Sequence, residues 1–93
     1  MNIFVVFEIS GDNIENIKPI LRNLGYYDYW ISNELRYDLP NNCMWKQNSS
    51  LENGKTEVEN AIGTRFLANN NIRLEKLIVL QATPWTGKAT VSL

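Results

Sequence analysis

The first side chain in this sequence that could do chemistry is Glu8, a carboxylate that closes the apolar run from Ile3 to Ile9. Asp12 follows in a stretch of turn-forming residues. Carboxylate oxygens are preferred ligands of Mg²⁺ and Mn²⁺, and a bound cation can position water for phosphodiester cleavage. A carboxylate at a strand end can instead be solvated or paired with a lysine or arginine. Glu8 is therefore a candidate catalytic residue and metal ligand, and Asp12 a candidate second ligand. The alternative is an ordinary surface charge.

Several other kinds of chemistry are excluded by composition. The sequence holds no histidine, which removes Ser–His and Cys–His nucleophile pairs, histidine-ligated zinc and the usual general base near neutral pH. With nine basic and ten acidic residues, the formal charge is −1. No basic field therefore spreads over the molecule to attract nucleic acid.

Two small groups of cations could still contact phosphate. Lys18 and Arg22 are four residues apart, so they share one face of a predicted helix. Arg36 and Lys46 lie near Trp45, and basic residues mixed with aromatic ones are typical of single-strand binders. The alternatives are a solvated helix face for the first group and an ordinary loop with a packed tryptophan for the second.

The compartment is indicated by the cysteine and the hydropathy. The single cysteine, Cys43, cannot form a disulfide within the chain, which favours a reducing compartment. We expect it to behave as a small buried hydrophobe rather than a reactive thiol. No stretch reaches the roughly 18 apolar residues that a membrane span needs, and the opening run lacks the pattern of a signal peptide. These features predict a cytoplasmic protein without a membrane partner.

The hydrophobic pattern predicts alternating strands and helices. The unbroken apolar opening is typical of a strand buried on both faces, in the centre of a sheet. Thr56 and Glu59 match a capping box that would begin the second helix, and Gly63 would mark its close packing on the sheet. The expected segments are a strand at 3–9, a helix at 17–24, strands at 26–32 and 43–47, a helix from 56 that ends at 69–71, and a strand at 72–82, with an irregular stretch at 33–42.

This order predicts one α+β domain over 1–93, with the βαββαβ arrangement of ferredoxin-like folds. Two helices would cover one face of a four-stranded antiparallel sheet, and the tail at 83–93 allows a short fifth strand. The other sheet face would have no helix of its own, and aromatic residues such as Tyr29, Trp30 and Trp45 have no assigned place in this arrangement. An open apolar face usually indicates a partner, most often a second copy of the chain. Trp85, which lies between a proline and a glycine in the tail, is typical of an anchor at an interface.

The opening MNIFVVFEIS and the short tryptophan-containing segment CMWKQN carry a family resemblance. The chain resembles the ferredoxin-like superfamily of small CRISPR-associated spacer-acquisition subunits, SinR-like and virulence-associated protein D-like proteins. The resemblance implies a homodimer packed sheet to sheet, with the tail exchanged between subunits so that Trp85, Val91 and Leu93 are buried at the interface. It also implies that the acid ending the first strand, here Glu8, binds a divalent metal across the dimer axis and supports nuclease activity. That residue is typically aspartate in the family, and glutamate is one methylene longer.

Three functions follow as hypotheses. The leading one is a small cytoplasmic homodimer that is not catalytic and is associated with nucleic acid or defence systems by resemblance. The second is a metal-dependent ribonuclease or deoxyribonuclease that uses Mg²⁺ or Mn²⁺, with Glu8 as ligand. The third is a protein-interaction module whose open sheet face recruits a different chain.

Overall fold

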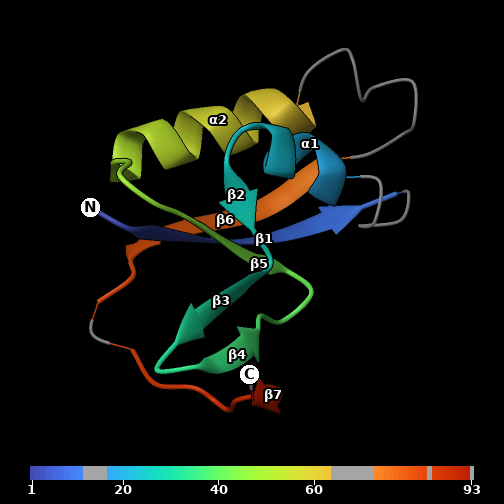
Figure 1. The fold of residues 1–93 in the computed structure, drawn as a ribbon. Coiled ribbons are helices and arrows are strands. Elements are labelled where there is room, and N and C mark those ends of the chain that lie inside the picture. Colours follow the sequence, from blue (N-terminus) through green and yellow to red (C-terminus); the bar gives the residue numbers. More distant parts are fainter. Residues whose placement is uncertain (12–16, 64–72, 84, 93) are drawn as a thin grey trace.

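The computed structural model describes residues 1–11, 17–63, 73–83 and 85–92. Within these ranges the chain forms a main sheet, a smaller second sheet and helices α1 and α2 (Figure 1). The α+β class is therefore confirmed. The elements are β1 (Ile3–Ser10), α1 (Lys18–Asn23), β2 (Tyr26–Tyr27), β3 (Tyr29–Ser32), β4 (Leu35–Asp38), β5 (Cys43–Lys46), α2 (Leu51–Gly63), β6 (Arg73–Gln81) and β7 (Val91–Ser92).

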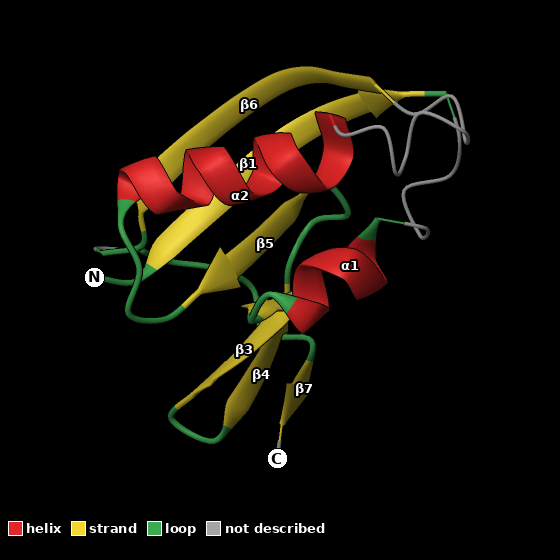
Figure 2. Cartoon of the chain, turned by 90° about the horizontal axis from the view of Figure 1, so that it is seen from above, coloured by secondary structure: helices red, strands yellow, loops and turns green. Residues whose placement is uncertain are grey.

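The main sheet has the strand order β2-β5-β1-β6, and each neighbouring pair is antiparallel. Val5 of β1 lies opposite Met44 of β5 on one side and Val79 of β6 on the other. The prediction that the opening run is an interior strand is therefore confirmed. The predicted burial on both faces is wrong, because Val6 is 39% exposed on the side that no helix covers. In Figure 1 both helices lie on the same side of this sheet, and Figure 2 shows α2 lying along β1. We call the opposite side the outer face.

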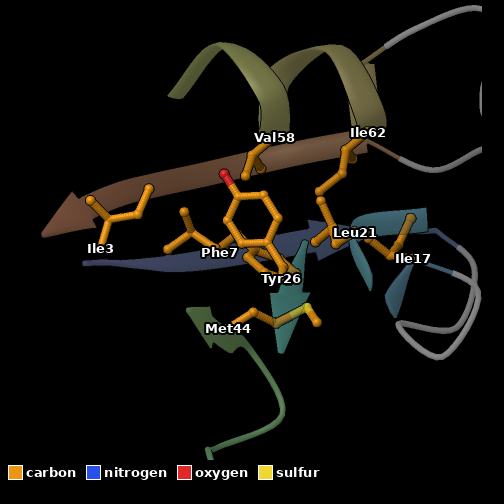
Figure 3. Close-up of a cluster of buried hydrophobic side chains, with 9 residues drawn as sticks. Ile3, Phe7, Ile17, Leu21, Tyr26, Met44, Val58 and Ile62 are labelled. Atoms are coloured by element: carbon orange, nitrogen blue, oxygen red, sulfur yellow. The ribbon is translucent and has the colours of Figure 1, made fainter. Parts of the chain in front are cut away.

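The hydrophobic core lies between the main sheet and the helices (Figure 3). Alternate residues of β1 point into it because successive side chains of a strand face opposite sides. Helix α2 supplies Val58 and Ile62, with Ala61 partly buried against the cluster. The buried cluster comprises Ile3, Val5, Phe7, Ile17, Leu21, Tyr26, Met44, Val58 and Ile62.

The predicted strand at 26–32 is not one strand. It breaks at Asp28, so that β2 joins the main sheet while β3 pairs with β4 in the second sheet. The stretch read as irregular holds β4, which is reached through a two-residue turn. Asn33 and Glu34 in that turn have φ values of 51° and 63°. Positive φ at both central residues is what a type I′ hairpin turn requires. Glutamate is an uncommon residue there, so the hairpin carries no strong sequence signal.

The start of α2 also differs from the prediction. The helix begins at Leu51, and the Ser50 hydroxyl accepts a 3.1 Å hydrogen bond from the Asn53 backbone N–H. Thr56 lies inside the helix, so the predicted capping box is wrong. The close helix–sheet contact is made by Gly54, where an added Cβ would lie 2.6 Å from Cδ1 of Ile3. The predicted helix end at 69–71 lies outside the described residues.

The first helix agrees with its prediction, since α1 has Pro19 in its first turn, where a missing N–H is tolerated. Gly25 follows it with φ +95°. In the described ranges, neither helix is long and apolar enough to cross a membrane.

Candidate functional site

Glu8 lies on the outer face of the main sheet, exposed and next to a cation. Its register partner across the β1–β6 pair is Lys76, and Lys76 Nζ lies 3.4 Å from Glu8 Oε2. Opposite charges directly across a strand pair attract each other, although exposure to water keeps the gain small. In this chain Glu8 therefore has the environment of a paired surface carboxylate.

The carboxylate does not fit a metal site within one chain. A hard divalent cation takes about six oxygen ligands, whereas Glu8 supplies one carboxylate and shares it with Lys76. The described residues contain no group of three histidine, cysteine, aspartate or glutamate side chains that could hold a metal. Asp12, the predicted second ligand, lies outside those residues. We therefore derive no catalytic step through a metal at Glu8.

Lys18 and Arg22 converge on one carboxylate. Lys18 Nζ lies 3.8 Å and Arg22 Nη2 lies 2.9 Å from Oδ2 of Asp28. Burial raises the pKa of Asp28, but the hydrogen bond and charge of Arg22, together with backbone N–H and Lys18, outweigh it and lower the pKa below its usual value. Lys18 is only 6% exposed. The pair is thus part of a partly exposed ion cluster at the break between β2 and β3, in which Lys18 is buried and Arg22 still reaches solvent.

Arg36 and Lys46, the other two predicted phosphate contacts, also have carboxylate partners. Arg36 Nε lies 2.9 Å from Asp38 Oδ1, and its guanidinium lies over the Tyr29 ring, 4.1 Å from the centroid. Lys46 Nζ contacts both oxygens of Glu57, at 3.1 and 2.9 Å. The four predicted cations are therefore divided among three carboxylates, Asp28, Asp38 and Glu57, instead of forming one basic patch.

An aromatic layer covers part of the outer face. We use this name for Phe4, Trp30, Tyr37, Trp45 and Trp85. Trp30 of the hairpin packs on Phe4 and Trp45 of the main sheet, with ring centroids 5.0 and 5.3 Å apart. The aromatic residues that the sequence left unassigned are thus used to attach the second sheet to the first.

The tail adds the last ring and the last strand of this region. Trp85 packs edge to face on Trp30 and on Tyr37, with centroids 4.3 and 5.0 Å apart. Strand β7 pairs with β4. Of the predicted interface residues, Trp85 and Val91 therefore contact their own chain, and Leu93 lies outside the described residues. Exchange of the tail stays a prediction, which would form these same contacts between subunits.

An apolar stripe remains exposed on the rest of the outer face. It consists of Val6, Ile78 and Leu80, which are 39%, 58% and 50% exposed. The sequence run 77–80 suggests burial, but its side chains alternate, and Leu77 and Val79 pack toward the helix-covered core. The hydrophobic pattern does not show this exposure, because it depends on where the strand lies in the sheet. The last strand of the predicted order lies at a sheet edge, where one face has no covering layer.

The chain matches no protein-family model, no curated protein sequence and no solved structure in the comparisons made. No family is therefore assigned, and the likeness of its opening strand to CRISPR-associated subunits stays a prediction.

Proposed function

We propose that this chain is a small, non-catalytic ferredoxin-like homodimer whose role is protein interaction. The strand order β2-β5-β1-β6 supports the fold proposal, because the ferredoxin-like arrangement also has its first and third strands in the centre. In this proposal β2, β5 and β6 are the second, third and fourth strands of that arrangement. The β3–β4 hairpin is an insertion between the second and third.

The observation that carries the dimer is the apolar stripe. Val6 lies opposite Ile78 in the β1–β6 register, and Phe4 lies opposite Leu80. The exposed side chains are therefore neighbours on one face rather than scattered apolar residues. Contiguous exposed apolar surface beside polar residues is a common mark of a protein interface.

The surroundings of the stripe favour a second copy as its occupant. At one end the apolar residues meet the Glu8–Lys76 pair, which adds one carboxylate and one ammonium. In a twofold interface the same patch faces itself, and a patch with an apolar centre and both charge signs at its rim can meet itself without like-charge contacts. Face-to-face packing of sheets would cover the stripe.

Analytical ultracentrifugation at micromolar concentration tests this directly. We expect the wild-type chain to sediment as a dimer and the double variant Ile78→Lys/Leu80→Lys to sediment as a folded monomer. In the variant, lysines of the two subunits would face each other, so that their ammonium groups would repel one another and lose their hydration. Leu24→Lys, at an exposed apolar position after α1 that lies outside the stripe, is the control and should remain dimeric. A monomeric wild type would overturn the proposal, and so would a dimeric double variant.

A link to nucleic acid or defence systems, and a cytoplasmic location, are proposed on sequence grounds. The first is supported by the resemblance of the opening strand, and the second by the single cysteine. Fluorescence anisotropy with labelled single-stranded RNA and DNA tests the first, and binding that falls with added salt is the expected sign of phosphate contacts.

A further inference from the structure

The tail and the β3–β4 hairpin line an open cavity of about 380 Å³ over the outer face of the main sheet. Four rings from separate parts of the sequence line it, namely those of Phe4, Trp30, Tyr37 and Trp85. Trp85 meets Trp30 and Tyr37 at interplanar angles of 65° and 81°. The walls therefore present both ring faces and ring edges. Hollows of a few hundred Å³ with mainly apolar walls and a few polar groups are typical of small-molecule sites.

Two charged residues line the cavity, Asp38 and Lys88. Asp38 is already compensated, since Oδ1 accepts a 2.9 Å hydrogen bond from Arg36 and Oδ2 accepts a 2.7 Å hydrogen bond from the Thr90 hydroxyl. Lys88 also lines the cavity. Within the described ranges no carboxylate lies within ion-pair distance of Lys88. Because Asp38 is already paired with Arg36, the ammonium of Lys88 is available to bind an anion.

Trp30, whose side chain lines the cavity, carries one polar atom without a hydrogen-bond partner in the described part of the chain. Trp30 is 8% exposed, and its indole N–H is buried without a partner among the described residues. Buried donors are normally paired, because an unpaired one loses its hydration without compensation. This N–H is closed off from the open space of the cavity, so the charge of a ligand is decided by the other lining groups.

We propose that this cavity binds a small aromatic carboxylate, with its flat ring among the four aromatic walls and its carboxylate at Lys88. A cationic aromatic ligand is disfavoured, because Asp38 is already paired and Lys88 would repel the added charge. The tail is part of the site, since it supplies both Trp85 and Lys88. This proposal does not depend on the homodimer.

Three indole compounds with the same ring and different charge test the proposal: indole-3-acetate, indole-3-acetamide and tryptamine. Amide and indole N–H chemical shifts of the ¹⁵N-labelled full chain are followed during titration with each compound. We expect the anion to bind most tightly and the cation most weakly, with the largest shifts at Trp30, Trp85 and Gly87. Lys88→Ala should weaken binding of the anion about fivefold, the size expected for one solvent-exposed ion pair, and leave the neutral amide unchanged.

Controls separate the cavity from general stickiness of an aromatic surface. Lys55→Ala removes an exposed lysine from α2, and Ile31→Ala removes an exposed apolar side chain that does not line this cavity. Both should bind indole-3-acetate as the wild type does, while Trp85→Ala should not bind it. The proposal is overturned if millimolar indole-3-acetate shifts no resonance of these residues, if tryptamine binds most tightly, or if Lys88→Ala leaves the affinity for the anion unchanged.

Discussion

Gly54 of α2 lies directly against Ile3 of β1, so that a Cβ at position 54 would stand 2.6 Å from Cδ1 of Ile3 and 3.0 Å from Cγ1 of Val79. This contact sets how closely the helix approaches the sheet. A glycine in the first turns of α2 is therefore a packing requirement and not a helix end.

Gly54→Ala should destabilise the chain in spite of the better helix propensity of alanine. Overpacking a core costs about 1–3 kcal/mol, and the propensity gain offsets about 1 kcal/mol of that. Chemical denaturation of Gly54→Ala, Ile3→Val and the double variant measures the effect. Because Ile3→Val removes the clashing methyl, its own cost should shrink or reverse in the Gly54→Ala background. Additive free energies of unfolding would show that the two side chains do not compete for the same space.

The N-terminus of α2 gives a second prediction, which separates two positions for its cap. Ser50→Ala should lower the free energy of unfolding by about 1 kcal/mol, since it removes the oxygen that accepts the Asn53 N–H. Thr56→Ala, at the position of the rejected capping box, should change it by less than about 0.5 kcal/mol. Thermal and urea denaturation followed by circular dichroism compare the two. Equal losses would contradict a helix that begins at Leu51.

The ion cluster at Asp28 predicts a pH dependence. The pKa of this carboxyl is lower in the folded chain than in the unfolded chain, where it is about 3.9. Its ionised form therefore stabilises the fold above that pH, and the stabilisation is lost as the pH falls through the folded-state pKa. Asp28→Asn should cost about 1 kcal/mol at neutral pH, a value reduced for the partial exposure of the cluster. The difference in the free energy of unfolding between Asp28→Asn and the wild type should become smaller below about pH 4.

Glu34→Gln, in the exposed turn of the hairpin, is the control for that pH series. It should leave stability within about 0.5 kcal/mol of the wild type throughout the series. If the difference in the free energy of unfolding between Asp28→Asn and the wild type stays constant from neutral to acid pH, the carboxylate at position 28 does not stabilise the fold by its charge.

The Glu8–Lys76 pair predicts a weak response to divalent cations. Since the ammonium of Lys76 lies 3.4 Å from the Glu8 carboxylate, millimolar Mg²⁺ or Mn²⁺ should shift the melting temperature by less than about 1 °C, the sign of negligible binding to the folded state. RNA and DNA substrates incubated with either ion should remain intact. Cleavage that requires the metal and disappears in Glu8→Ala would instead support the nuclease hypothesis.

The sequence predicts the parts of this fold that depend on local hydrophobic pattern. The unbroken run of β1 indicates an interior strand. Pro19, in the first turn of α1, and Gly25, just after its end, correctly indicate where this helix begins and ends. The pattern fails where a tertiary contact decides. Gly54 resembles a helix breaker in the sequence, but the space against Ile3 requires it. The break at Asp28 is equally invisible locally, because the aromatic and β-branched residues on either side of it all favour strand.

The candidate site is predicted less well, because charges find partners far away in the sequence. The spacing of Lys18 and Arg22 places them on one helix face, but the carboxylate between them comes from the turn after β2. The sequence predicts Trp85 as an anchor on a partner subunit, which stays a prediction. Its contacts with Trp30 and Tyr37 of its own chain depend on how the tail returns to the hairpin. The exposure of Ile78 and Leu80 depends on the edge position of β6, which only the strand order reveals.

The aromatic layer has a consequence for how unfolding can be observed. The chain has three tryptophans, and all of them, Trp30, Trp45 and Trp85, belong to this layer, whereas the described core beneath α2 contains none. Tryptophan emission therefore responds to the attachment of hairpin and tail, while far-ultraviolet ellipticity follows mainly the helices over the other face. A red shift in emission at a lower denaturant concentration than the loss of ellipticity would mean that the two sides of the main sheet unfold one after the other. The hairpin and tail would then detach before the helices unfold.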